Sequence, residues 1–144
     1  SWAFAIARRE SSFMPDANSP VGAKGLMQIM PGTAKQLAKK TVSTHYLLNA
    51  NNNITLGTKY LRELLQQNKG NHVLATASYN AGPYRVKKWV KKVDDLPADI
   101  WIEMIPYKET REYVKSVLAY QQIYQIKSGQ TQSFFDQVVK MKIN

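Results

Sequence analysis

Residues 108–127 read KETREYVKSVLAYQQIYQIK and carry the longest helical pattern in the chain. Tyr113, Val117, Tyr120 and Tyr124 recur at intervals of three or four residues, so they share one face of a helix. A stripe of this kind usually packs against other elements, and we expect it to form part of the core. The stretch therefore favours a helical fold.

The same periodicity extends outward along the chain, and no long alternating strand interrupts it. It predicts further helices at residues 2–12, 33–40, 52–67, 72–79, 84–92, 98–104 and 133–140. Between the first two, a segment rich in Pro, Gly and Asn is predicted to form a loop. The helix over 52–67 is expected to have one apolar face, which carries Ile54, Gly57, Leu61, Leu64 and Leu65. The predicted fold class is all-α.

The length and composition suit one compact domain covering residues 1–144, since 44% of the residues are hydrophobic. The chain contains no Cys, which excludes disulfides, thiolate nucleophiles and Cys-based metal sites. It contains only two His, His45 and His72, so no multi-His metal centre is expected. No apolar run approaches the length of a membrane-spanning helix.

The charge is one-sided, with 20 Lys and Arg against 10 Asp and Glu and a formal net charge of +10. This balance indicates an anionic partner such as nucleic acid, a membrane surface or an acidic polymer. A basic run surrounds Trp89 and consists of Arg85, Lys87, Lys88, Lys91 and Lys92. It is either a solvated helix face or an electrostatic contact for a polyanion.

The chain begins with Ser1 and Trp2, without an initiator Met and without a signal-peptide pattern. We expect it to be a piece of a longer protein whose targeting signal is not part of this sequence.

Glu10 is the first candidate for catalysis. On the first predicted helix it continues the small, apolar stripe of Ala3 and Ala7, near the negative end of the helix dipole. Burial and the dipole both disfavour a carboxylate, so we expect a raised pKa. A carboxyl group that is still protonated near neutral pH suits general-acid cleavage of an ether-like bond. The alternative is a structural ion pair with Arg8, Arg9 or another cation.

A second candidate is the glycine-containing loop SPVGAKGLMQIMP at residues 19–31. Its glycines permit close approach of a ligand to the backbone. Gln28 offers two donors and an acceptor, which suit sugar hydroxyls or an acetamide group. The alternative is an ordinary surface loop with Leu26 and Ile29 in the core.

Two further stretches place polar groups at helix ends. In ASYNAGP at residues 77–83, Tyr79 and Asn80 precede a strong helix stop, although the stretch also fits a plain C-cap. In IPYKETREY at residues 105–113, Glu109 lies in a first helical turn, where an acidic residue normally favours the helix dipole.

Together these stretches resemble the catalytic domain of the soluble lytic transglycosylases, the SLT family, which are relatives of goose-type lysozyme. The resemblance covers roughly residues 4–126, and the family's four motifs occur in order and in register at 5–13, 19–34, 79–83 and 105–113. It implies an all-α, lysozyme-like domain with a glycan-binding groove.

The resemblance also implies roles for individual residues. Glu10 matches the single catalytic acid and base, and Glu109 matches a second carboxylate that contacts substrate without attacking it. The implied substrate-binding residues are Ser11, Ser19, Gln28, Met30, Tyr79, Asn80 and Glu109. No metal and no cofactor is implied. The expected partner is peptidoglycan in the bacterial periplasm, bound by a monomer that neither spans a membrane nor binds nucleic acid.

The chain departs from the family pattern at three places, one of which is the stretch 41–46, which is shorter than in the family. Tyr84 and Arg85 follow Pro83 where the family usually has Gly before the basic residue, and Asn49-Ala50 stands where Asp-Pro is usual. These changes bear on glycan preference and on a turn, and none involves Glu10.

The implied reaction cleaves the β-1,4 bond between N-acetylmuramic acid and N-acetylglucosamine without water and leaves 1,6-anhydromuramic ends. Glycosidases commonly use two carboxylates, but only Glu10 fits a reactive one here, so the substrate's N-acetyl carbonyl would replace the second. One alternative is a goose-type hydrolase that uses water, and another is a non-catalytic glycan-binding module. A nucleic-acid binder is suggested only by the net charge and has no recognised motif.

Overall fold

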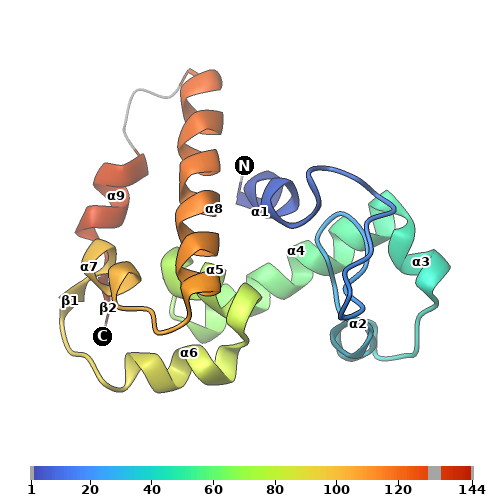
Figure 1. Cartoon of the computed structure of the whole chain (residues 1–144), viewed down its shortest axis with the longest axis horizontal. Coiled ribbons are helices and arrows are strands. Elements are labelled where there is room, and N and C mark those ends of the chain that lie inside the picture. The colour runs from blue at the N-terminus through green and yellow to red at the C-terminus, as the bar shows by residue number, and fades with distance from the viewer. Residues whose placement is uncertain (1, 130–133, 144) are drawn as a thin grey trace. The chain divides into compact units, whose positions relative to one another are not determined.

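The computed structural model describes residues 2–129 and 134–143 of the chain. Its backbone falls into two compact units, one formed by Trp2–Arg62 and the other by the described residues from Glu63 onward. Helix α4 (Ala50–Gln67) begins in the first unit and ends in the second (Figure 1).

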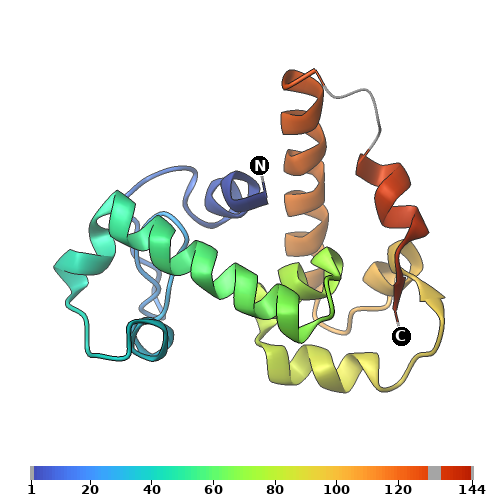
Figure 2. The same ribbon diagram turned by 180° about the vertical axis from the view of Figure 1, so that it is seen from behind.

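The first unit contains α1 (Trp2–Ser11), α2 (Pro31–Ala38), α3 (Thr44–Leu48) and most of α4. A long loop joins α1 to α2, and Figure 2 shows it doubling back on itself. Two isolated antiparallel bridges, Asn18 to Lys24 and Lys24 to Ile29, hold these passes together. Helix α2 begins at Pro31, whose missing N–H costs nothing at a first helical position.

Two sequence predictions in this unit need correction. Helix α3 was not predicted, because five residues are too few to show a helical period, although its cap Ser43 accepts a 3.0 Å hydrogen bond from the Tyr46 N–H. In α4, Ile54 is 39% exposed, whereas Asn53 is fully buried. The buried face of α4 therefore contains a polar residue where an apolar one was expected.

The second unit contains α5 (His72–Ala81), α6 (Pro83–Val90), α7 (Ala98–Glu103), α8 (Lys108–Lys127) and α9 (Phe134–Lys140). Helix α5 packs against α6 and α8, while α9 packs against α7 and α8. Two short strands, β1 (Leu96–Pro97) and β2 (Lys142–Ile143), pair in antiparallel register with Leu96 opposite Ile143. The strands were not predicted, since two-residue strands have no detectable alternation.

The predicted helices are present, and the all-α fold class is confirmed. Their ends differ from the predicted ones by no more than two residues; residue 133, the predicted start of the last helix, lies outside the described residues. In the stripe on α8, Tyr113 and Val117 are buried and Tyr120 and Tyr124 are half-buried, so it is a packing surface as predicted. None of the helices in the described ranges combines the length and apolar character that a bilayer crossing demands.

Candidate active site

Glu10 lies in the last turn of α1 and is half-buried. Three residues of the preceding turns, Ala5, Ile6 and Ala7, are buried, so α1 is anchored by this face. The position agrees with the prediction that Glu10 continues a packed stripe. Its carboxyl group is therefore carried by a helix that packing holds in place.

Ser11 links the end of α1 to the following loop. Its side chain is buried, and its hydroxyl lies 2.7 Å from the Leu26 carbonyl oxygen and 3.0 Å from the Ala7 carbonyl oxygen. Because a hydroxyl carries one proton, these two acceptors share it. The residue next to Glu10 thus ties α1 to the loop that carries Gln28.

Asn53, on helix α4, also holds this loop. Its Oδ1 accepts a 2.7 Å hydrogen bond from the Met27 N–H, and its Nδ2 donates to the carbonyls of Lys24 at 2.8 Å and Leu47 at 2.9 Å. These bonds satisfy buried backbone groups that would otherwise be unpaired. Sequence analysis missed this role; the available signal was a polar residue within the apolar spacing of a helix.

Two glycines allow the loop and α4 to approach each other. Gly25 has a φ of 80°, and a Cβ there would collide with the Asn53 amide and the Leu47 carbonyl. A Cβ on Gly57 would collide with the Met27 side chain, which is fully buried. Met27 therefore occupies the space that Gly57 leaves free, and this packing fixes the residue before Gln28.

Gln28 has a φ of 51° and is half-buried. Its Nε2 donates to the Ala17 carbonyl at 3.0 Å and to the Gly25 carbonyl at 2.9 Å. Since both neighbours are acceptors, the amide nitrogen must face them, and both of its hydrogens are used. Gln28 can therefore offer a ligand its Oε1 as an acceptor, but not the two donors that the sequence suggested.

Ser19 and Met30 lie at the two ends of this loop. The Ser19 hydroxyl accepts a 2.9 Å hydrogen bond from the Ala23 N–H, so its own proton remains available for donation. Met30 is the N-cap residue of α2, and 41% of its surface is exposed. The first unit thus gathers Glu10, Ser11, Ser19, Gln28 and Met30 on α1 and the loop that follows it.

The other three predicted residues lie in the second unit. Tyr79 and Asn80 are half-buried near the end of α5, and Glu109 is exposed in the first turn of α8. The Asn80 Oδ1 accepts a 2.8 Å hydrogen bond from the hydroxyl of Thr110, which is buried. This bond joins the end of α5 to the start of α8, next to Glu109. Sequence analysis missed Thr110, although it directly follows Glu109.

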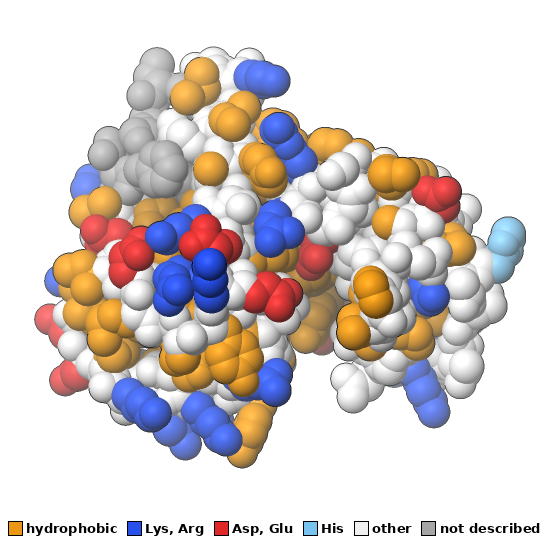
Figure 3. Space-filling view, in the orientation of Figure 1, with side chains coloured by type: hydrophobic (Ala, Val, Ile, Leu, Met, Phe, Trp, Pro, Cys, Tyr) orange, Lys and Arg blue, Asp and Glu red, His pale blue; other side chains and the backbone are white. Residues whose placement is uncertain are grey.

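The basic run around Trp89 is exposed on α6 and just beyond it, and Figure 3 shows Lys and Arg side chains gathered over this helix. Two cations of this basic run form cation–π contacts with neighbouring aromatic rings. The Arg85 guanidinium lies 5.3 Å from the Tyr107 ring, and the Lys88 ammonium lies 4.4 Å from the ring of Tyr84. The rings of Trp89 and Tyr107 form an edge-to-face pair, with 5.2 Å between their centroids. The run is therefore exposed, and two of its cations, Arg85 and Lys88, lie against aromatic rings.

Within the described part of the chain, no group of three or more His, Asp or Glu side chains is placed to hold a metal ion. His72 lies at the start of α5. Burial lowers the pKa of His72 below its usual 6.5, against the opposing effect of a hydrogen bond to the Gly70 backbone.

Comparison with known proteins identifies the family. The profile of the transglycosylase SLT domain matches residues 1–102. The chain belongs to the SLT transglycosylase family. The profile of the soluble lytic transglycosylase helical domain matches residues 104–133. The resemblance inferred from the four motifs is thereby confirmed.

Relatives of this SLT chain are enzymes named after murein. The soluble lytic murein transglycosylase of Salmonella typhimurium is 46% identical over 139 residues, which are 92% of this chain and 22% of that protein. The membrane-bound lytic murein transglycosylase D of Escherichia coli is 33% identical over 116 residues, 76% of this chain and 25% of that protein. The chain thus spans 22% of the length of the first of these relatives.

Solved structures of lytic transglycosylases agree with this family assignment. An inactive mutant of the lytic transglycosylase Slt from Pseudomonas aeruginosa superposes with a TM-score of 0.86 at 50% identity, covering 92% of this chain and 22% of that one. The 70-kDa soluble lytic transglycosylase in complex with bulgecin A gives a TM-score of 0.85 at 45% identity, covering 89% and 22% of the two chains. These matches confirm the lysozyme-like helical fold.

Proposed function

We propose that residues 1–144 act as the catalytic domain of a peptidoglycan lytic transglycosylase, a carbon–oxygen lyase. The observation that carries the proposal is the position of Glu10 at the end of a packed helix, next to a serine that binds the Gln28 loop through the Leu26 carbonyl. Preorganisation of this kind is what a general acid needs to meet a glycosidic oxygen held nearby. Membership of the SLT family supports the same reaction.

In the proposed reaction, the Glu10 carboxyl first donates its proton to the glycosidic oxygen between N-acetylmuramic acid and N-acetylglucosamine. The C1–O bond breaks, and the neighbouring N-acetyl carbonyl supports the positive charge at C1. The Glu10 carboxylate then takes the proton from the 6-hydroxyl of the same sugar, whose oxygen bonds to C1. Water is neither consumed nor released, and Glu10 ends in its starting protonation state.

The other residues are proposed to bind the glycan. The Gln28 Oε1 would accept a hydrogen bond from a sugar hydroxyl or an acetamide N–H, and the Ser19 hydroxyl would donate one. Met30 offers an exposed apolar contact. Ser11 would act by holding the loop in place, since its hydroxyl is already bonded.

The residues of the second unit are proposed to contact the same class of substrate. Tyr79 offers a phenol and Glu109 an exposed carboxylate. Asn80 keeps its amide hydrogens as donors, because its bond to Thr110 uses the oxygen. No metal or cofactor takes part. We further propose a monomer that acts on murein in the periplasm and has no nucleic-acid partner, a location in keeping with the relatives' names.

The test is the Glu10→Gln variant, which keeps the size of the side chain and removes the transferable proton. Loss of general acid–base catalysis typically costs about 10²–10⁴-fold in rate, and we expect at least that loss while the fold is retained. Glu112→Gln is the matched control, because Glu112 is exposed on α8, and it should keep wild-type turnover. Near-native activity of Glu10→Gln would refute the assignment of the acid.

The mass of the products separates the lyase from the hydrolase. Digestion of purified peptidoglycan by the wild-type domain should release muropeptides that are lighter by one water than those of a lysozyme. Products that carry solvent oxygen after digestion in heavy-oxygen water would retain Glu10 as the acid but show that water closes the reaction.

A further inference from the structure

Helix α6 presents a basic side that the proposed reaction does not use. Its residues lie at positions i, i+3, i+4 and i+7, so they share one side of the helix. All four are exposed, whereas Val86, on the opposite side, is buried. This side, the α6 face, consists of Tyr84, Lys87, Lys88 and Lys91. Tyr84 is 71% exposed, so the α6 face combines a large aromatic ring with three cations.

In the described part of the chain, no ion pair neutralises the positive charge of the α6 face. Lys87, Lys88 and Lys91 pair with no acidic side chain of residues 2–129 or 134–143. The sequence itself contains no Asp or Glu between Glu63 and Asp94. The α6 face therefore favours an anionic partner.

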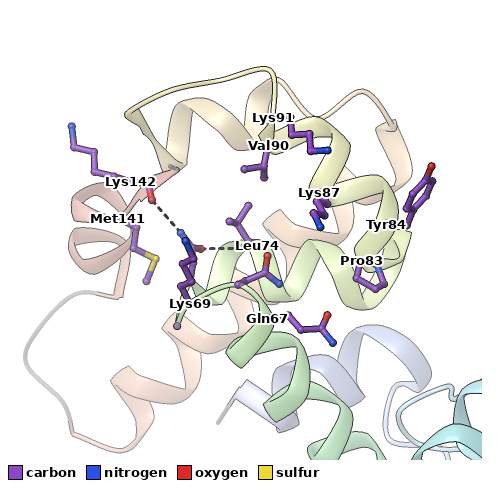
Figure 4. Close-up of a pocket in the computed structure, with 13 residues that line it drawn as sticks. Gln67, Lys69, Leu74, Pro83, Tyr84, Lys87, Val90, Lys91, Met141 and Lys142 are labelled. Carbon is purple, nitrogen blue, oxygen red and sulfur yellow. Dashed lines mark hydrogen bonds between the residues drawn. The ribbon is translucent and has the colours of Figure 1, made fainter.

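Tyr84 lies between two hollows in the surface of the second unit. The larger hollow, of about 940 Å³, lies between the turn after α4, helices α5 and α6, and strand β2 (Figure 4). Tyr84, Lys87 and Lys91 are among the residues that line it. The smaller hollow, of about 470 Å³, is lined in part by Tyr84, Arg85 and Lys88. In Figure 4 the Tyr84 ring points away from the rest of the fold. Each hollow thus places at least two cations beside the same exposed ring.

The chemistry of these side chains narrows the class of anion. The cations of the α6 face are all Lys, which acts as a point charge, whereas the planar fork of Arg matches individual phosphate groups best. Lysine clusters respond to the diffuse negative potential at the surface of an anionic bilayer. A Tyr ring, with its apolar body and polar tip, suits the headgroup layer of such a bilayer.

A nucleic acid fits the α6 face less well. Proteins that bind single strands commonly stack successive bases on several aromatic rings. Tyr84 is the aromatic residue of the α6 face, and the nearby Trp89 is half-buried and paired with the Tyr107 ring. One exposed ring among lysines is therefore better matched to a lipid surface.

We propose that the α6 face docks on the surface of a bilayer that contains anionic lipids. The lysines attract the lipid phosphates, the Tyr84 ring enters the headgroup layer, and the two hollows receive headgroups on either side of it. The Lys88 ammonium, 4.4 Å from the centroid of the Tyr84 ring, already holds one cation beside that ring. Because Val86 is packed into the fold, α6 lies on the bilayer without inserting, and binding is reversible and sensitive to salt.

Sedimentation with vesicles tests the proposal. One set of vesicles contains one third phosphatidylglycerol and two thirds phosphatidylcholine, and the other contains phosphatidylcholine alone. The face variant combines Lys87→Gln, Lys88→Gln and Lys91→Gln. The matched control changes the net charge equally at three exposed lysines elsewhere and combines Lys35→Gln, Lys40→Gln and Lys127→Gln.

We expect the wild type to sediment with the anionic vesicles at 0.1 M salt, to be released at 1 M salt, and not to bind phosphatidylcholine alone. Removing three charges that lie at the bilayer surface should weaken binding about 100-fold in the face variant. The control variant should stay within a few-fold of the wild type. Equal losses in the two variants, no loss in either, or equal binding to both kinds of vesicle would overturn the proposal.

Substitutions of Tyr84 test the contact of the ring separately from charge. Tyr84→Ala should bind the anionic vesicles severalfold more weakly without a change in salt dependence. Tyr84→Trp should retain binding, and its emission should move to shorter wavelength on these vesicles relative to that of the wild type, which has three Trp. An unchanged affinity of Tyr84→Ala, or an unshifted emission of Tyr84→Trp, would overturn the proposed docking geometry.

Two other polyanions complete the test. The face and control variants should bind purified peptidoglycan equally well. A loss on peptidoglycan as large as the loss on vesicles would overturn the proposal and assign the α6 face to the wall polymer. A short DNA duplex that binds the wild type more tightly than the vesicles, and binds the face variant weakly, would overturn it in favour of nucleic acid. The product masses test the proposed reaction independently, because docking on vesicles does not require Glu10.

Discussion

Gln28 illustrates how the chemistry of a single side chain depends on its neighbours. In isolation its amide can donate two hydrogen bonds and accept others. In the structure the Ala17 and Gly25 carbonyls accept both amide hydrogens, so only the Oε1 atom can bind a ligand, as an acceptor. The same bonds hold the loop, which gives Gln28 a structural role beside its proposed role in binding.

We predict that Gln28→Ala lowers both stability and turnover without changing the form of the pH–rate profile. Two lost hydrogen bonds should reduce the free energy of unfolding by about 1–3 kcal/mol, and the amide has no titration near neutrality. Urea unfolding and initial rates across the pH range measure the two effects. Gln36→Ala, at an exposed position of α2, is the control. A profile that lost one of its limbs would contradict the assigned role.

A second prediction concerns His72 and the pH dependence of stability. Its pKa is lowered by burial in the folded state, so as the pH falls below about 6.5 the unfolded chain takes up this proton first. The stability that neutral His72 contributes is present above that pH and is lost as the pH falls towards the folded-state pKa. Removing the group should therefore weaken the pH dependence of stability.

The corresponding experiment compares melting temperatures at pH 7.5 and 5.5. We expect a smaller decrease for His72→Gln than for the wild type, and an unchanged decrease for His45→Gln, which alters an exposed histidine on α3. If the two variants behaved alike, the pH dependence would have another source.

At the scale of the elements, α4 is the support of the candidate site. Asn53 binds the loop through three hydrogen bonds, and four residues later Gly57 receives the Met27 side chain. These residues lie one turn apart, so the same helical face provides both the polar and the apolar contact. Glycine inside a helix costs about 0.5–1 kcal/mol relative to Ala, and here the close approach of Met27 explains its presence.

Gly57→Ala should therefore destabilise the protein despite the better helix propensity of Ala. The added methyl collides with the buried Met27 side chain, and overpacking of this kind costs about 1–3 kcal/mol. Gly32→Ala in α2 meets no atom within 4 Å and should be neutral or stabilising by up to about 1 kcal/mol. Denaturant unfolding of both variants measures the difference. An unchanged or higher stability of Gly57→Ala would show that Met27 repacks freely.

The turnover of Gly57→Ala tests the role of this packing independently of stability. Met27 precedes Gln28, so a displaced Met27 should lower activity on peptidoglycan in Gly57→Ala and leave it unchanged in Gly32→Ala.

The whole molecule carries a net charge of +10, and its proposed substrate is an anionic polymer. Screening shortens the Debye length from about 10 Å at 0.1 M salt to about 3 Å at 1 M salt. We predict that the Glu10→Gln variant sediments with purified peptidoglycan at low salt and is released as salt is raised. Chitin, an uncharged glycan, serves as the control and should show little salt dependence. Binding to peptidoglycan that is insensitive to salt would rule out a contribution of the net charge.

Much of the architecture was predictable because helices leave a local signature. The apolar spacing of α8 matched its observed ends at residues 108 and 127, and Gly82 and Pro83 marked the end of α5. Helix α3 and the strands β1 and β2 were missed because two to five residues are too few for a period to show. The position of Glu10 on a packed helix face was likewise predicted from its spacing to Ala3 and Ala7 alone.

The sequence by itself determined the helical class, the family and the candidate residues, because these follow from periodicity and from motifs of neighbouring residues. Only the tertiary structure decided what those residues are free to do. It engaged the donors of Gln28, bonded the hydroxyl of Ser11, and placed Asn53 in the core instead of Ile54. The physical reason is that a hydrogen bond between residues distant in sequence, such as Asn53 to Met27, arises from packing and leaves no periodic trace in the chain.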